Sequence, residues 1–342
     1  MIVLRTPGGV SLRLRPRALV VGAGCALLAA ALGVLALGSG DYPMSAADVL
    51  RTLTGGGSPA EEFIVTELRL PRLVTAVCVG AALALAGAVF QSLVRNPLGS
   101  PDVLGFTQGA STGALLVVVA GGSSLALGAA AVAGGLVTGV LVHALAWRHG
   151  LPGFRLILVG IGVTAILTGV NGYLLTRAPL MDAARAVLWL TGSLDGRGWV
   201  NALPLLLALA VLVPVVFLGC GPALRMIELG DDAASALGVP VERVRLLLLG
   251  AAVLLVSLAA AAAGPVSFVA LTAPHLARRL TRAPGPNLLP AMAVGAALLV
   301  GADHVAQRAF SGHQLPVGVV TGVIGGGYLV WLLATERKAG RL

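Results

Sequence analysis

Two arginines that flank a Leu-Pro pair are the side chains of this 342-residue sequence best suited to bind an anion. Arg69 and Arg72 come just before an uncharged run at residues 73–94. A guanidinium group pairs with a carboxylate or a phosphate through two parallel hydrogen bonds. The pair is therefore predicted to dock acidic side chains of a partner, with contact to lipid headgroups as the alternative.

A second set of polar groups lies inside the apolar run at residues 156–176. Thr164, Thr168 and Asn171 follow i, i+4, i+7 spacing, so a helix would place them on one face. Polar side chains in a membrane helix usually face the bundle interior or a water-filled path. The threonines could instead bond to their own helix while Asn171 bridges to another, and the spacing does not separate these alternatives.

Asp303, His304 and Arg308 form the third candidate group, at the end of the apolar run at residues 288–302. An ionisable residue within a membrane is a functional candidate by default. Almost no other carboxylate occurs in such runs, however, so we expect a structural ion pair between Asp303 and Arg308. The cysteines are far apart in the sequence, and no metal site is expected.

Signatures of enzymes are missing from the sequence. Lys338 is the only lysine and lies near the C-terminus, so a phosphate-binding loop with its lysine is not possible. A zinc-protease motif and a nucleophile elbow are missing as well. We therefore expect no catalytic residue and no cofactor in this chain, and any ATP hydrolysis must take place in another chain.

The composition places these groups in a membrane protein. Hydrophobic residues make up 57% of the chain and charged residues 11%, and the mean hydropathy is +0.96, far outside the range of soluble domains. The 23 basic residues give a net charge of +9 but are spread between apolar runs, which argues against nucleic-acid binding. An all-α, polytopic membrane fold is predicted.

Uncharged runs of spanning length predict about ten transmembrane helices. Two runs are too long for one helix, and turn residues divide them at 121–124 and at Gly264-Pro265. A short echo, Val-Gly-Ala-Ala-Leu at 79–83 and 294–298, carries little weight as evidence of a repeat. The predicted spans are 18–37, 73–94, two within 103–147, 156–176, 200–224, two within 246–277, 288–302 and 315–334.

The arginines determine the orientation of these spans. With ten spans, most of the flanking arginines fall on one side, as the positive-inside rule requires of cytoplasmic loops, and Arg69 and Arg72 fall outside. Residues 1–342 then form one transmembrane domain with a basic cytoplasmic N-terminus (1–17) and a cytoplasmic tail (335–342). The run at 18–37 is longer than the apolar part of a signal peptide, so we expect a retained helix.

The segment at residues 220–245 is the longest charged cytoplasmic loop in this topology. Asp231 and Asp232 suit the first turn of a helix, Gly238 suits its end, and Pro240 suits the start of another. The pattern predicts two short helices at the cytoplasmic face. An ordinary connecting loop is the alternative.

Four segments resemble one transporter family, in the order in which they occur. They are residues 69–111, 230–245, 263–280 and 314–326, and they include Arg-Leu-Pro-Arg, Gly-Asp-Asp and Ala-Pro-His-Leu-Ala-Arg-Arg. The sequence resembles the iron-chelate uptake permeases of type II ABC importers, which include vitamin B12, haem and ferric-siderophore permeases. The resemblance runs from about residue 18 to the C-terminus and is greatest to ferric-siderophore permeases of the enterobactin type.

This resemblance implies a permease subunit in the inner membrane of a bacterium that moves its cargo by alternating access. The implied partners are a second permease subunit, expected to be a different but related chain, two ATPase subunits, and a periplasmic or lipid-anchored substrate-binding protein. The rivals are a cobalamin or haem permease of the same family and an ion-coupled secondary transporter, for which Asp303 alone is thin support.

The resemblance also implies roles for individual residues. Those that would meet glutamates of the binding protein are Arg69 and Arg72. Those that would contact the ATPase are Gly230, Asp231, Asp232, Ala233, Gly238, Glu242 and Arg243. Those that would line the translocation path are Gln91, Thr164, Thr168 and Asn171. Those that would form a cytoplasmic gate are Pro152, Gly153 and Phe154.

One departure from the family pattern concerns the docking surface. Many members carry a third outward arginine before the last span, where this chain has Gln307 with Arg308 beside it. Adjacent helical residues point about 100° apart. Docking at this position is therefore not expected to carry over.

Overall fold

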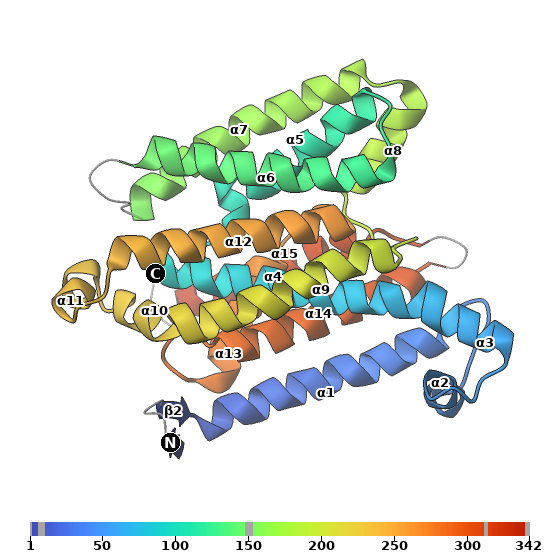
Figure 1. Ribbon diagram of the computed structural model, residues 1–342, viewed down its shortest axis with the longest axis horizontal. Coiled ribbons are helices and arrows are strands. Elements are labelled where there is room, and N and C mark those ends of the chain that lie inside the picture. Colours follow the sequence, from blue (N-terminus) through green and yellow to red (C-terminus); the bar gives the residue numbers. More distant parts are fainter. Residues whose placement is uncertain (1, 6–10, 148–152, 311–313, 339–342) are drawn as a thin grey trace.

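The computed structural model of the chain describes residues 2–5, 11–147, 153–310 and 314–338. Within these residues the chain is almost wholly helical (Figure 1), which confirms the predicted all-α class. The exception is a short antiparallel hairpin of β1 (Ile2–Arg5) and β2 (Ser11–Leu14), in the segment expected to be only a basic N-terminus.

The long helices run roughly along one direction and form a bundle (Figure 1). They are α1 (Pro16–Gly38), α4 (Leu70–Leu93), α5 (Phe106–Val119), α6 (Ser124–Ala146), α7 (Gly153–Arg177), α9 (Trp199–Pro214), α12 (Val241–Ala263), α13 (Val269–Thr281), α14 (Leu288–Arg308) and α15 (Val317–Lys338). Shorter helices are α2 (Ala46–Leu53), α3 (Pro59–Phe63), α8 (Leu180–Leu190), α10 (Gly221–Ile227) and α11 (Asp231–Ala236).

Eight helices of the described part are long and apolar enough to cross a membrane. The α5 and α13 helices have 14 and 13 residues, or about 20 Å at 1.5 Å per residue, which is less than the ~30 Å hydrocarbon core. The chain is a multi-pass membrane protein. The count of ten spans remains a prediction, because these two helices need adjoining segments to cross.

Both predicted helix breaks are present. The α5 helix ends before Gly121, which has a φ of +70°, and the Ser123 hydroxyl accepts a hydrogen bond from the Ala126 backbone N–H at the start of α6. The α12 helix ends at Gly264, which has a φ of +73° and would overlap the Trp189 carbonyl oxygen if it carried a Cβ. Only glycine combines this backbone conformation with such a close approach.

The α4 helix is the centre of the bundle. Every residue from Cys78 to Leu93 is buried, and α4 packs against α12, α13 and α14. A Cβ on Gly80 would overlap the carbonyl oxygen of Gly295 on α14, and a Cβ on Gly295 would overlap that of Gly80. Small residues allow the two helices to approach this closely. Van der Waals packing at such contacts stabilises helix association in a membrane, because apolar side chains gain little by leaving lipid for the bundle interior.

The bundle has two ends that differ in structure (Figure 1). The α2 and α3 helices lie at one end, here the α2–α3 end, and α10 and α11 lie at the other, here the α11 end. The α1 helix begins and α15 ends at the α11 end. The α5, α6 and α7 helices form a separate layer that packs against the rest through α12 (Figure 1).

The segments that follow Pro240 and Pro179 also differ from the sequence prediction. The α11 helix ends as expected near Gly238, which has a φ of +82°, but Pro240 precedes the 23-residue α12 instead of a second short helix. The reason is that the sequence after Pro240 contains no turn signal or proline before Gly264. The second difference is α8, an unpredicted helix that starts directly after Pro179.

Candidate functional site

A cavity of about 430 Å³ opens at the α2–α3 end. It lies between the end of α1, the start of α4, the end of α14 and the loop at residues 195–197. Its charged lining residues are three arginines and three aspartates, namely Arg69, Arg72, Arg197, Asp41, Asp195 and Asp303. The predicted docking pair thus shares its site with four charged groups from other elements.

Arg72 is held by carboxylates of its own chain. Its Nε and Nη2 atoms lie 3.1 and 2.9 Å from the two oxygens of Asp303, a bidentate pair, and Nη1 lies 3.4 Å from Asp195. The side chains of Arg72 and Asp303 are only 15% and 6% exposed. The Gln307 amide donates a further hydrogen bond to Asp303 at 2.8 Å.

The expected ion pair between Asp303 and Arg308 is therefore wrong, because Asp303 pairs with Arg72 on α4. Five residues along an α-helix correspond to about 500°, so Arg308 points about 140° away from Asp303. Asp303 is buried, and the helix turn leaves Arg308 exposed. The structural role predicted for Asp303 is retained, with a different partner.

Arg69 and Arg197 are bound differently from Arg72. Arg69 donates to the carbonyl oxygens of Leu37 at 2.6 Å and Tyr42 at 2.8 Å, and no carboxylate of the described residues lies within ion-pair distance of it. Arg197 donates from Nε to the Ser193 carbonyl at 3.2 Å. Burial lowers the pKa of Arg197, and the nearby Asp195 carboxylate opposes that shift.

At the α11 end, Asp231 joins three elements. Its two oxygens accept from Arg95, at the end of α4, at 3.0 Å and from Arg245, on α12, at 2.8 Å. Arg245 also contacts Glu242 at 3.4 Å, and its side chain is 4% exposed. The first turn of α11 is thereby fixed to the two most buried long helices.

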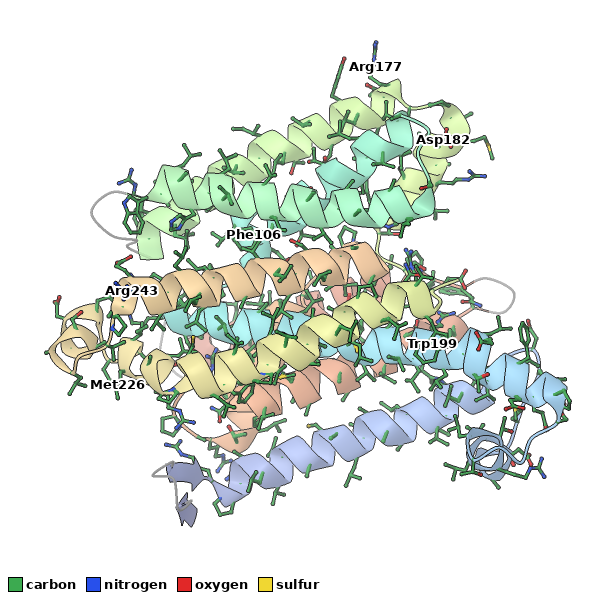
Figure 2. All side chains as sticks on the ribbon, in the orientation of Figure 1. Phe106, Arg177, Asp182, Trp199, Met226 and Arg243 are labelled. Atoms are coloured by element: carbon green, nitrogen blue, oxygen red, sulfur yellow. The ribbon has the colours of Figure 1, made fainter. Side chains whose placement is uncertain are left out.

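The other residues predicted for ATPase contact have a different environment. Asp232, Ala233, Gly238, Glu242 and Arg243 are exposed, and Gly230 is half-buried. Figure 2 shows Arg243 beside α11 and Met226 on the adjacent α10. Two apolar side chains also protrude here, Leu229 at 72% and Leu237 at 62% exposure. Exposed leucines beside charged groups are typical of a surface that a partner covers.

The predicted path residues are mostly engaged within the chain. Asn171 is buried between α7 and α5, where its Oδ1 accepts from Thr112 at 2.6 Å and its Nδ2 donates to Gln108 at 3.0 Å. Thr164 bonds to the carbonyl oxygens of Gly160 and Val103. These contacts match the alternative interpretation, in which Asn171 bridges two helices and the threonines bond to carbonyl oxygens of their own helix. Of the three side chains on α7, only that of Thr168 is exposed.

Gln91 lies inside the bundle. It is 2% exposed, donates to the Leu271 carbonyl at 3.1 Å and accepts a hydrogen bond from Arg278, so it joins α4 to α13. In this conformation it does not line an open path. Its neighbour Ser92 donates to Glu228 at 2.7 Å, a second link between α4 and the α11 end.

Residues 27–335 match the family model described as the FecCD transport family. The chain belongs to the FecCD transport family. The ferric enterobactin transport system permease FepG of Escherichia coli K12 is 46% identical over 92% of this chain and 96% of its own. The ferric dicitrate permease FecD of the same organism is 39% identical over 92% and 96%.

A solved structure supports the same assignment. An inward-facing transporter of the metal-chelate ABC type matches with a TM-score of 0.80 and 30% identity, covering 92% of this chain and 99% of its own. FecCD members are permease subunits of ABC importers, and they are not enzymes themselves. They work with separate ATPase subunits and a substrate-binding protein.

The predicted gate lies at the start of α7. Pro152 is outside the described residues, Gly153 is the first residue of α7, and Phe154 is 79% exposed. The role of these residues remains a prediction for this FecCD chain.

Sequence reasoning missed Arg197. Its signal was an arginine between two glycines, directly before the run at 200–224 and on the side assigned to Arg69. Within the described part, no group of three or more His, Cys, Asp or Glu side chains could hold a metal ion.

Proposed function

We propose that this FecCD chain is the membrane-spanning subunit of an ATP-driven importer that carries a ferric siderophore of the catecholate type through a bacterial inner membrane. The observation that carries the proposal is a bundle with a cavity lined by three arginines and three aspartates at one end and an anchored short helix, α11, at the other. The 46% identity to a ferric enterobactin permease supports the cargo. Iron wrapped in a chelator needs no protein ligands in the membrane.

The proposed orientation places the α2–α3 end outside and the α11 end in the cytoplasm. Supporting contacts at the α11 end come from arginines on several elements: Arg15 bonds to Pro284, Arg17 to Leu280 and Arg95 to Asp231. Basic residues are enriched on the cytoplasmic side of membrane proteins. The substrate-binding protein then meets the cavity, and the ATPases meet α11.

The proposed complex contains two permease subunits, this chain and a different but related one, and two ATPase subunits. A loaded binding protein, periplasmic or lipid-anchored, docks outside, and closure of the ATPases moves α11. The Asp231 contacts transmit that displacement to α4 and α12, and the bundle opens its path to the other side. The path lies on a surface of the bundle that faces the second subunit, with Thr168 exposed for contact.

The cargo is tested by growth of a strain that lacks this gene, on single iron chelates as the sole iron source. Growth on a catecholate siderophore is expected to be lost and to return with the native chain. Retained growth on every iron chelate, together with a defect in growth on cobalamin, would be consistent with an ATP-driven importer but would exclude iron as its cargo. Import driven by an ion gradient without ATP would contradict the importer itself.

The Asp231→Ala variant is expected to uncouple ATP hydrolysis from import. It detaches α11 from Arg95 and, among the described residues, leaves the buried Arg245 with only Glu242 as an ion-pair partner, at 3.4 Å. The measurement is ATP hydrolysed per siderophore imported in proteoliposomes. The ratio is expected to rise several-fold, because α11 loses the charge pairs that hold it to α4 and α12.

The matched control for this variant is Asp182→Ala. It removes a carboxylate of a loose pair with Arg185, 3.9 Å long, on α8 at the other end of the bundle, where Figure 2 shows Asp182 projecting outward. Equal ratios for the two variants would mean that the Asp231 contacts do not transmit the movement.

A further inference from the structure

Three arginines converge on the turn that joins α13 to α14, at the α11 end of the bundle. Arg15 donates from Nη1 to the Pro284 carbonyl oxygen at 2.8 Å, and Arg17 donates from Nε to the Leu280 carbonyl oxygen at 3.0 Å. Arg282 is the residue at which α13 ends. The fold thus brings two arginines to the turn from positions 269 and 263 residues away in the sequence.

These three positive charges have no counter-ion in the chain. Among the described residues, no carboxylate forms an ion pair with any of them. Glu228 approaches the turn near Gly285, but it accepts a hydrogen bond from the buried Ser92 at 2.7 Å. Positive charges that lie together repel one another. The arrangement is therefore favourable only if an anion from outside the chain joins it.

The turn between α13 and α14 is fixed by its own hydrogen bonds. The Asn287 amide donates to the carbonyl oxygens of Ala283 at 2.8 Å and Gly285 at 2.9 Å. Arg282 has a φ of +48°, a left-handed conformation that residues with a side chain seldom adopt. Its side chain is exposed and forms no hydrogen bond within the described part. The turn therefore presents this guanidinium group to the surroundings of the bundle.

Helix capping accounts for only part of this arrangement. Basic side chains often bond to the last carbonyls of a helix, and the bond from Arg17 to Leu280 at the end of α13 is of this kind. Arg15 and Arg17 each use one nitrogen in this way, and their other guanidinium nitrogens have no partner among the described residues. A guanidinium group binds phosphate oxygens through parallel hydrogen bonds, and one that is already fixed loses little freedom on binding.

The surroundings of the three arginines indicate where a phosphate would come from. The α1 helix is the least buried of the eight described helices that could cross a membrane, with 11% of its apolar window buried. It lies at the edge of the bundle and packs against α14 (Figure 1). Exposed apolar side chains follow the arginines on both helices, Leu19 and Val20 on α1 and Leu289 on α14. Cations next to exposed apolar side chains match a phospholipid, whose phosphate adjoins its hydrocarbon chains.

We propose that Arg15, Arg17 and Arg282 form a binding site for the phosphate headgroup of an anionic phospholipid of the cytoplasmic leaflet. Basic groups between membrane helices on the cytoplasmic side bind such headgroups. The bound lipid supplies the missing negative charge and joins the start of α1 to the turn between α13 and α14. The inference uses the orientation given under the proposed function, but it does not depend on the cargo.

The test is lipid binding to the full chain in detergent, measured by native mass spectrometry. The chain is titrated with phosphatidylglycerol, which is anionic, and separately with phosphatidylethanolamine, which has no net charge. The native chain is expected to bind phosphatidylglycerol at least about tenfold more tightly. Arg282→Gln is expected to weaken that binding about fivefold, since each arginine near a lipid surface contributes about this factor. The triple variant Arg15→Gln, Arg17→Gln, Arg282→Gln is expected to bind the two lipids equally.

Two controls separate the site from net charge and from folding. The triple variant Arg51→Gln, Arg177→Gln, Arg185→Gln removes the same charge from exposed arginines elsewhere, including Arg177 at the end of α7 (Figure 2). It is expected to bind phosphatidylglycerol within about twofold of the native chain. Arg282→Gln removes no side-chain hydrogen bond of the described part, so the bundle is expected to stay folded, and Arg282→Lys is expected to keep most of the affinity because it keeps the charge.

Equal affinity of the native chain for the two lipids would overturn the inference, as would native-like binding of phosphatidylglycerol by the first triple variant. Displacement of the lipid by millimolar inorganic phosphate would mean that the site takes a free anion instead. Unchanged lipid binding together with weaker assembly with the ATPase subunits would assign the three arginines to the ATPase contact. Retained growth on every iron chelate is a separate result, which would reject the proposed cargo and leave the lipid site standing.

Discussion

Replacement of Gly87 by alanine is expected to prevent the chain from folding into its native bundle. Gly87 is buried on α4 where that helix crosses α13, and a Cβ built there would overlap the backbone carbonyl of Ala270. The obstruction is main chain of another helix, so no side-chain rotation can relieve it. Overpacking of this kind costs about 1–3 kcal/mol where side chains yield, and we expect more than about 4 kcal/mol here.

The matched control is Gly250→Ala on α12. Gly250 also lies inside a long helix, but no atom lies within 4 Å of the position of its Cβ. Alanine favours a helix over glycine by about 1 kcal/mol, so this variant is expected to be as stable as the native chain or slightly more. The measurement is the yield of monodisperse protein in detergent and its thermal unfolding midpoint. Equal midpoints for the two variants would contradict the α4–α13 packing.

Turns and helix ends could be predicted from the sequence because their signals are local. Gly-Gly-Ser-Ser at 121–124 and Gly264-Pro265 divide the chain where the helices end, since a positive φ requires glycine or a similar residue. The echo of Val-Gly-Ala-Ala-Leu is weak evidence of a repeat, yet it places Gly80 and Gly295 at the crossing of α4 and α14. A repeated small residue indicated a close contact, but not which helices make it.

Side-chain partners could not be predicted because they depend on how the helices are arranged. Arg72 and Asp303 are 231 residues apart, and only the α4–α14 packing brings them together. Helical periodicity correctly placed Thr164 and Asn171 on one face. It could not state that this face meets α5 rather than an open path, because both environments satisfy a polar side chain.

The same limit applies to Asp231. Its position at the start of a helix follows from capping preferences, and the resemblance to a family suggested a surface that meets the ATPase. The structure adds that Asp231 itself faces inward to Arg95 and Arg245. The outward surface consists of its exposed neighbours, including Leu229 and Leu237, whose exposure the sequence pattern does not predict.

Removal of the Asp303 carboxylate is expected to have the second large effect. In Asp303→Ala, the partners that the Arg72 guanidinium keeps among the described residues are Asp195 at 3.4 Å and Gln314 at 3.0 Å, while its side chain remains largely buried. Breaking one half of a buried pair costs about 3–5 kcal/mol. The free energy of unfolding, measured by detergent denaturation in mixed micelles, is expected to fall by an amount in this range.

The double variant Asp303→Ala, Arg72→Ala separates the ion pair from simple packing. With both charges gone, no group is left buried and uncompensated, so the double variant is expected to be more stable than Asp303→Ala alone. If the two losses add instead, the side chains act independently and the bidentate geometry contributes little. Partial recovery of stability in the double variant would mean that the buried charge of Arg72 is tolerated in the bundle because the Asp303 carboxylate pairs with it.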